Sequence, residues 1–234
     1  MSGEKLPSRS SRAEIDAFLR QVTSTPARSS ERGGRLLFAL DATASREPTW
    51  DRACQIQSEM FSETVALGGL SVQLCYYRGF NEFITSPWLS DAAALLARMN
   101  AVRCLGGYTQ IERVLRHARQ ETQRQKISAT VFIGDCMEEQ ADRLCQLAGE
   151  LGILGPPLFL FQEGDDVLAE SAFRQFAQLS NGAYCHFDGT SAEQLRDLLS
   201  AVAVYAAGGQ PALEDFTRRR GGIARQLSHR TRGN

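Results

Sequence analysis

Oxygen-bearing side chains gather in residues 41–45 (DATAS), directly after the apolar run Leu36 to Leu40. A short continuous apolar run is typical of a strand buried on both faces of a parallel sheet. Asp41 would then lie at the carboxyl end of that strand, where open α/β sheets bind their ligands. With Thr43 and Ser45 it offers the oxygen ligands that hard cations such as Mg²⁺ prefer. Taken alone, the segment fits an N-cap or Asx turn that starts a helix equally well.

Two further segments could meet this strand end. Residues 105–109 (LGGYT) precede a helical pattern, and their glycines allow close backbone approach, with Thr109 at the expected N-cap. Residues 129–135 (ATVFIGD) form another apolar run that ends in an acid, Asp135. If the two apolar strands are neighbours, Asp41 and Asp135 meet at one sheet edge with three hydroxyls around them.

The elements that must position these side chains alternate along the chain. Strands are expected at 35–41, 70–77, 81–85, 128–134, 157–162 and 183–187, and apolar residues repeat at helical spacing between most of them. The link between the second and third strands is too short for a crossover helix, so these two strands should form an antiparallel hairpin at an edge. We therefore predict an α/β fold: a three-layer αβα, Rossmann-like, doubly wound sheet, mostly parallel with one antiparallel edge strand.

Composition limits the class of protein. The chain has 234 residues, 43% of them hydrophobic, and a net charge of −1, which suits one full-sized core and no general affinity for polyanions. Its six cysteines include no Cys-x-x-Cys pair, so zinc ribbons and thioredoxin-type sites are not expected. No signal-peptide core and no apolar stretch of membrane-spanning length is present, and we predict a soluble, cytoplasmic protein with reduced cysteines.

Three regions are expected. Residues 1–33 are rich in Ser, Arg and Pro and should be largely disordered, with one short amphipathic helix near 14–20. Residues 34–207 should form the α/β domain. Residues 208–234 form a basic tail: Phe216 to Asn234 contains six arginines and no acid, which suits either a solvated tail or an arm that docks on an acidic partner or on RNA.

The three oxygen-bearing segments, in this order, resemble the von Willebrand factor A (VWA) domain and its metal-ion-dependent adhesion site (MIDAS), as in intracellular, bacterial members of the family. The family pattern is Asp-x-Ser-x-Ser, then a Thr after glycines, then an Asp that ends the fourth strand. Residues 41–45 match with Thr43 in place of the first serine, 105–109 carry the middle Thr, and 132–135 (FIGD) carry the last acid. The order of strands and helices over 34–207 also fits.

The resemblance implies a metal site made of five residues: Asp41, Thr43, Ser45, Thr109 and Asp135. Thr43 and Ser45 would bind Mg²⁺ or Mn²⁺ directly, the two acids would act largely through water, and Thr109 would alternate between both modes. A carboxylate of a protein partner would complete the coordination, because neutral direct ligands leave the cation under-neutralised.

Two positions depart from the family pattern. Gly134 and Cys136 stand where the family usually has Thr and Gly around the last acid. Gly134 removes a hydroxyl that often supports the acid, and Cys136 is expected to be a packed thiol, since a soft ligand would be unusual for Mg²⁺. Nearby, Glu138 and Glu139 are expected to open the next helix, where negative charge suits the helix dipole. His117 is expected to face solvent.

The predicted function is a protein–protein interaction module, not an enzyme, within a cytosolic complex, with no membrane or DNA partner. The rival from another class is a haloacid dehalogenase-like, Mg-dependent phosphatase with Asp41 as nucleophile, because 134–139 (GDCMEE) copies one of its motifs. That chemistry needs a second acid at position 43 and a lysine near the phosphoryl group, and the domain's one lysine, Lys126, lies at the wrong end of its strand. A metal-free interaction scaffold is the third alternative. Phosphate-binding glycine motifs are lacking.

Overall fold

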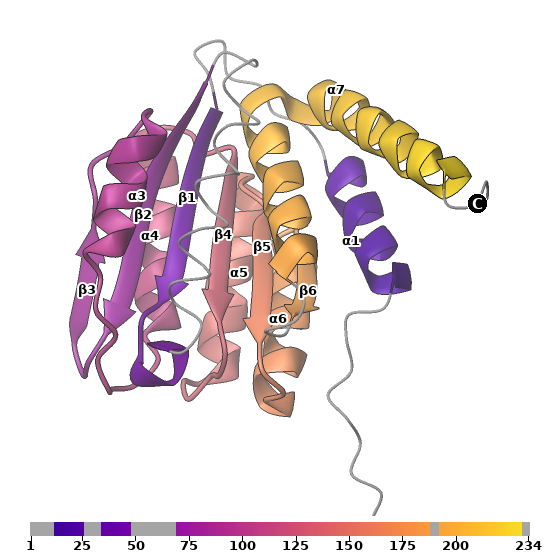
Figure 1. The fold of residues 1–234 in the computed structure, drawn as a ribbon. Coiled ribbons are helices and arrows are strands. Elements are labelled where there is room, and N and C mark those ends of the chain that lie inside the picture. Colours follow the sequence, from indigo (N-terminus) through magenta and orange to yellow (C-terminus); the bar gives the residue numbers. More distant parts are fainter. Residues whose placement is uncertain (1–11, 26–33, 48–68, 188–191, 231–234) are drawn as a thin grey trace, which may run out of the picture.

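A six-stranded sheet forms the middle layer of the protein, as seen in a computed structural model (Figure 1). The structure describes residues 12–25, 34–47, 69–187 and 192–230. At 12–13, 192–194 and 220–230 it describes the backbone alone. The helix that the α/β pattern requires between the first two strands falls outside the described residues.

The strand order is β3-β2-β1-β4-β5-β6, and every neighbouring pair is parallel except β2 and β3. The strands are β1 (Gly34–Asp41), β2 (Leu70–Arg78), β3 (Glu82–Thr85), β4 (Ala129–Gly134), β5 (Leu158–Glu163) and β6 (Ala183–Phe187). This confirms the predicted fold class, including the antiparallel pair at one edge. Strands β1 and β4 are direct neighbours, with Leu40 opposite Ile133, so the acids that follow them are brought to the same edge.

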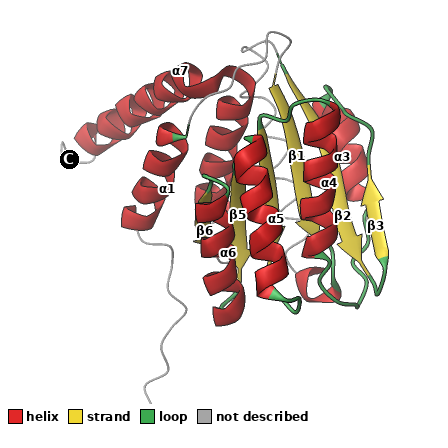
Figure 2. Ribbon diagram, turned by 180° about the vertical axis from the view of Figure 1, so that it is seen from behind, coloured by secondary structure: helices red, strands yellow, loops and turns green. Residues whose placement is uncertain are grey.

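Helices cover both faces of the sheet. On one face lie α4 (Ile111–Arg124), α5 (Ala141–Leu154) and α6 (Val167–Leu179), seen in front of the strands in Figure 2. On the other face lie α3 (Ala92–Asn100) and the first part of α7 (Ala192–Arg230) (Figure 1). Each face has its own apolar cluster, because alternate side chains of the buried strands point to opposite sides.

The first described helix contacts both the edge strand β6 and the last helix. Helix α1 (Arg12–Ser24) packs there against α7, and its Phe18 ring lies 5.3 Å from that of Phe161. Helix α7 is broken at Gly209, where the backbone is non-helical, and the following turn still places Leu213 and Phe216 in the core cluster. The structure thus has helices in both predicted tail regions, and the predicted boundaries at 33–34 and 207–208 stay predictions.

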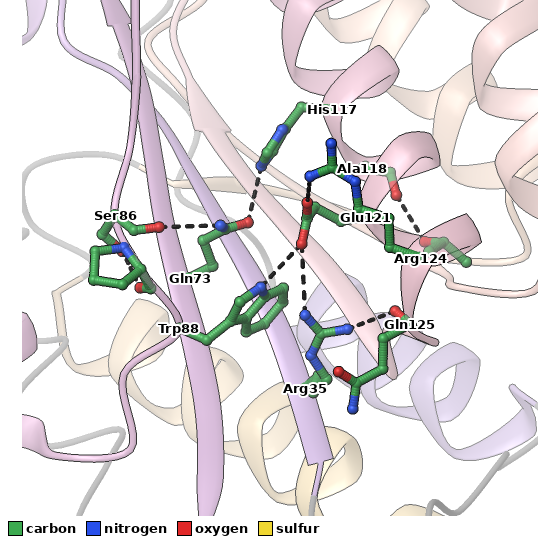
Figure 3. Close-up of polar contacts among 11 residues, drawn as sticks. Arg35, Gln73, Ser86, Trp88, His117, Ala118, Glu121, Arg124 and Gln125 are labelled. Carbon is green, nitrogen blue, oxygen red and sulfur yellow. Dashed lines mark hydrogen bonds and ion pairs between the residues drawn. The ribbon is translucent and has the colours of Figure 1, made fainter.

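A polar cluster lies towards the amino ends of the strands (Figure 3). The carboxylate of Glu121 accepts a hydrogen bond from Trp88 Nε1 (3.0 Å) and forms ion pairs with Arg35 (3.5 Å) and Arg124 (2.8 Å). The guanidinium of Arg35 also lies over the Trp88 ring, 3.7 Å from its centroid. We call these four residues the Glu121 network; they join β1 and the segment after β3 to the last turns of α4.

Candidate metal centre

Asp41 is fully buried at the end of β1, and both of its carboxylate oxygens accept hydrogen bonds. Oδ1 accepts from the backbone N–H of Thr43 (2.8 Å) and Oδ2 from the hydroxyl of Tyr77 (2.8 Å) on the neighbouring strand β2. Burial raises the pKa of Asp41 to about 6, and the charge of Asp135 adds to the rise, while the bonds from Thr43 and Tyr77 oppose it. Asp41 therefore takes part in an Asx-type turn and also faces another acid.

Asp135, directly after β4, faces Asp41 as the sequence predicts. Ligand atoms of Asp41, Asp135 and Cys136 all lie within 4.8 Å of one another. Oδ1 of Asp135 is buried and has no hydrogen-bond partner among the residues that the structure describes. Burial, the charges of both acids and a hydrogen bond with Asp135 raise the pKa of the Cys136 thiol. A buried, unsatisfied carboxylate oxygen beside a second acid is costly unless a cation compensates it.

The three predicted hydroxyls belong to residues that line an open hollow of about 220 Å³, which Cys136, the neighbour of Asp135, also lines. Thr43 Oγ1 and Ser45 Oγ are 3.1 Å apart at the start of the short 3₁₀ helix η1 (Ala44–Arg46). The hollow is lined by residues of the first two segments and of the loop after β4: Thr43, Ala44, Ser45, Gly106, Gly107, Thr109, Cys136 and Glu138. The structure thus brings all five predicted site residues to one edge of the sheet.

Two backbone contacts hold the 105–109 loop in this place. Leu105 N–H donates to the carbonyl of Ala42 (3.1 Å), which fixes the loop to the end of β1. Gly107 passes so close to the backbone of Gly79 that a Cβ there would lie 1.9 Å from the Gly79 carbonyl oxygen. Any side chain at position 107 would therefore push the loop, and Thr109 with it, away from the strand end.

Glu138 and Glu139 hold the Thr109 loop rather than the start of α5. Thr109 N–H donates to Glu138 Oε2 (2.9 Å), and Glu138 N–H donates to Thr109 Oγ1 (3.1 Å). The carboxylate of Glu139 accepts from the N–H groups of Ile111 (2.6 Å) and Glu112 (2.8 Å) at the start of α4. The expectation that these acids serve the dipole of the following helix is thus wrong: they connect the β4–α5 loop to α4.

Gly134 is explained by packing. A Cβ at this position would lie 2.8 Å from the ring of Phe132 and 3.6 Å from Asp41 Cβ. The hydroxyl-bearing residue that usually precedes the last acid in VWA domains would therefore displace the Phe132 ring.

One buried residue of the site could not be recognised from the sequence. Arg46, the last residue of η1, is 1% exposed, and its Nη1 lies 2.8 Å from Glu163 Oε2 at the end of β5. This ion pair fixes η1, and with it the Thr43 and Ser45 hydroxyls, to the middle of the sheet. A charged residue among exposed neighbours in a loop is normally assigned to the surface, which is why the pattern could not reveal it.

Lys126 does not approach the acids. It is exposed and precedes β4, whereas Asp135 follows the carboxyl end of that strand. A phosphatase of the dehalogenase type would need a cation at the phosphoryl group, and no lysine of the described residues lies at this edge.

Comparison with models of known protein families and with curated proteins finds no match. Solved structures do match in fold. An aerotolerance-related membrane protein from Bacteroides fragilis superposes with a TM-score of 0.54 at 17% identity, over 70% of this chain and 96% of the other. The VWA domain of SpRpn10 gives 0.57 at 13% identity, over 76% and 97%.

A third match is proximal thread matrix protein 1 of the mussel byssus, described with a zinc-occupied MIDAS motif. Its TM-score is 0.60 at 14% identity, over 75% of this chain and 47% of the other. At these identities the likeness shows the fold, which is VWA-like. No helix among the described residues combines the length and the apolar composition needed to cross a membrane.

Proposed function

We propose that this chain, with its VWA-like fold, is a protein-interaction module that binds its partner through a divalent cation held by Asp41, Thr43, Ser45, Thr109 and Asp135. The observation that carries the proposal is the buried Oδ1 of Asp135, which has no partner among the described residues and lies beside the fully buried Asp41. A cation stabilises two adjacent acids beside a group of hydroxyls, and among the described residues no hydrogen-bond donor meets Oδ1 of Asp135.

The donor set suits the group. Hydroxyl and carboxylate oxygens are the ligands of Mg²⁺ and Mn²⁺, so we propose these two as the first ions to test. Thr43, Ser45 and Thr109 would hold the ion from the wall of the hollow, and Asp41 and Asp135 would supply negative charge from its floor. A bound cation supplies a positive charge that faces the hollow and attracts an anionic group. Because the hollow is open, a carboxylate of a protein partner is the natural ligand from outside.

Two of the similar structures support a cation-dependent binding role. A MIDAS motif with zinc is described for the mussel protein, and a pilus adhesin, SpaC from Lactobacillus rhamnosus, also matches in fold with a TM-score of 0.55 at 14% identity. We further propose a cytosolic place in a larger complex, in keeping with the free cysteines of the described residues. The basic segment after residue 216 is proposed as a second contact, with an acidic protein or RNA.

The proposal is tested by adding Mg²⁺ or Mn²⁺ to the metal-free protein. A ligand that binds the native state alone raises the melting temperature, by an amount that corresponds to about 2.7 kcal/mol at a hundred times the dissociation constant. We expect this rise in the wild type and its loss in Asp135→Asn, with Asp165→Asn, an exposed acid outside the site, as the matched control. Calorimetry and melting curves that do not respond to any divalent cation would refute the metal site.

The role of the cation in partner binding needs a separate test. The native partner, once captured on the immobilised wild type, should be released by a chelator and should not be retained by Asp135→Asn. Retention under both conditions would show that another surface binds it, and truncation after Thr217, which keeps the core residues Leu213 and Phe216, would then test the basic segment.

A further inference from the structure

Cys136 lies next to the two acids of the proposed metal site and also lines the hollow that holds its hydroxyls. Its sulfur lies within 4.8 Å of carboxylate oxygens of Asp41 and Asp135, and its side chain lines the same hollow as the three hydroxyls. Among the described residues, no other side chain is common to these two sets. Cys136 is half-buried and next in sequence to Asp135, whose Oδ1 has no hydrogen-bond partner among the described residues.

We propose that Cys136 is a metal ligand and that its thiolate makes the site select zinc-like divalent cations over Mg²⁺. The inference rests on the proposed function, since it concerns the same site. Thiolate is a soft ligand that favours Zn²⁺, Co²⁺ and Cd²⁺, whereas Mg²⁺ takes oxygen and keeps several waters. Two carboxylates and one thiolate, beside the hydroxyls that line the hollow, form a donor set of mixed type, which suits Zn²⁺ and leaves a position for water or an external carboxylate.

The geometry gives each donor a separate role. Asp41 already accepts two hydrogen bonds, so its orientation is fixed before any ion binds. Oδ1 of Asp135 accepts no hydrogen bond from the part of the chain that the structure describes, so it is available to an ion. When the sulfur–metal bond forms, the S–H bond breaks and its proton passes to solvent, so that the three donors contribute three negative charges to a doubly charged ion.

The test uses Co²⁺ as a spectroscopic probe on the full, reduced chain. A thiolate bound to Co²⁺ gives a sulfur-to-metal charge-transfer band in the near ultraviolet, which oxygen ligands do not give. We expect this band in the wild type, its loss in Cys136→Ser and Cys136→Gly, and its retention in Cys145→Ser. Cys145 is the matched control because it is also half-buried and in no disulfide. It lies outside the site, on α5, where its thiol donates a hydrogen bond to Gln175 of α6.

Affinities measured by competition should separate the ions. We expect Cys136→Ser to weaken Zn²⁺ and Cd²⁺ binding about tenfold or more, while Mn²⁺ binding changes by less than about threefold. If Co²⁺ binds without the band and Cys136→Ser leaves the Zn²⁺ affinity unchanged, the inference is overturned and the proposed oxygen site stands. If neither Mn²⁺ nor Co²⁺ binds the wild type, both proposals fail. Near-ultraviolet circular dichroism of each variant establishes that it is folded. Cys136→Ser and Cys136→Gly test the loss of the charge-transfer band independently of each other.

Discussion

The two ends of the central sheet treat buried acids in opposite ways. At the amino ends of the strands, Glu121 accepts a hydrogen bond from Trp88 Nε1–H and pairs with two guanidinium groups (Figure 3). Burial alone would raise its pKa, but the hydrogen bonds from Trp88 and Arg124 hold it below the usual range. At the carboxyl ends, Asp41 faces a second acid, and its pKa is raised to about 6. The same kind of side chain is thus satisfied within the protein at one end and left under-compensated at the other.

This difference separates a structural role from a binding role. A buried charge surrounded by its own partners is complete, and removing one member leaves the others unsatisfied. A pair of acids that repel each other lowers the stability of the metal-free protein and is retained only if something outside the chain compensates it. Substitution of an acid should therefore destabilise one end and stabilise the other.

The largest effect is expected for Glu121→Ala. It leaves Arg35, which is largely buried, and the Trp88 N–H without their partner, and we expect the free energy of unfolding to fall by about 3 kcal/mol. Urea unfolding measures this change. Glu121→Gln, which keeps an oxygen for Trp88 but loses the charge, should lose less. Divalent-cation affinity should be the same in all three proteins, and a change of more than about threefold would contradict the independence of the two ends.

Asp135→Asn should act in the opposite direction. It removes the like charge beside Asp41, so we expect the metal-free protein to gain roughly 1 kcal/mol in free energy of unfolding while its response to metal disappears. A metal-free variant less stable than the wild type would mean that Asp135 has a structural partner.

The raised pKa of Asp41 also sets the direction in which the stability of the metal-free protein changes with pH. The native pKa of Asp41 is about 6, above the ordinary value of 3.8, so between these values the native state holds a proton that the unfolded chain has lost. The stability of the metal-free protein should therefore fall as pH rises through this window and level off above it. In Asp135→Asn the fall should be smaller, because one cause of the raised pKa is gone.

Glu139→Gln should have an intermediate effect on both stability and the site. Its carboxylate accepts two N–H bonds at the start of α4, where the helix dipole favours a negative charge, and the loss should be about 1 kcal/mol. Since α4 follows Thr109 directly, we also expect metal affinity to weaken severalfold. Asp166→Asn, which changes the N-cap acid of α6, is the matched control and should lose similar stability without the change in affinity.

The sequence allowed much of the fold to be predicted, for an identifiable reason. Strands buried on both faces leave continuous apolar runs, and the acids that end two of them mark the carboxyl edge. The short link after Arg78 required an antiparallel pair, which the structure confirms. The convergence of Asp41 and Asp135 followed from one further assumption, that their strands are neighbours.

Contacts between distant loops and helices were beyond such reasoning. Glu139 follows β4 in sequence yet bonds to α4, because the loop folds back across the strand ends. Arg46, which follows β1, pairs with Glu163 at the end of β5, with β4 between the two strands. His117 was expected in solvent, and this was wrong: it bonds to Gln73 on β2 at 2.8 Å, and its ring meets that of Phe83. A polar residue in an apolar strand gives no sign of which helix residue will meet it.

His117 provides the smallest effect and the last test of the comparison. Burial lowers its pKa below the ordinary 6.5, the charge of Arg124 adds to this, and the charge of Glu121 opposes it. The unfolded chain therefore takes up a proton before the native state does, so the stabilising contribution is complete above pH 6.5 and is lost as pH falls towards the native pKa. The contribution of His117 to the free energy of unfolding should thus rise with pH, opposite to the contribution of Asp41.

The pH ranges of the two contributions overlap, so the measurement is best made in the Asp135→Asn background, where the Asp41 contribution is reduced. There, His117→Gln should flatten the rise in unfolding free energy between pH 5 and 7, by less than about 1 kcal/mol in total. If the unfolding free energy depends on pH equally in the two proteins, His117 ionises as readily in the native state as in the unfolded chain. The hydrogen bond to Gln73 would then have no energetic role in keeping His117 neutral.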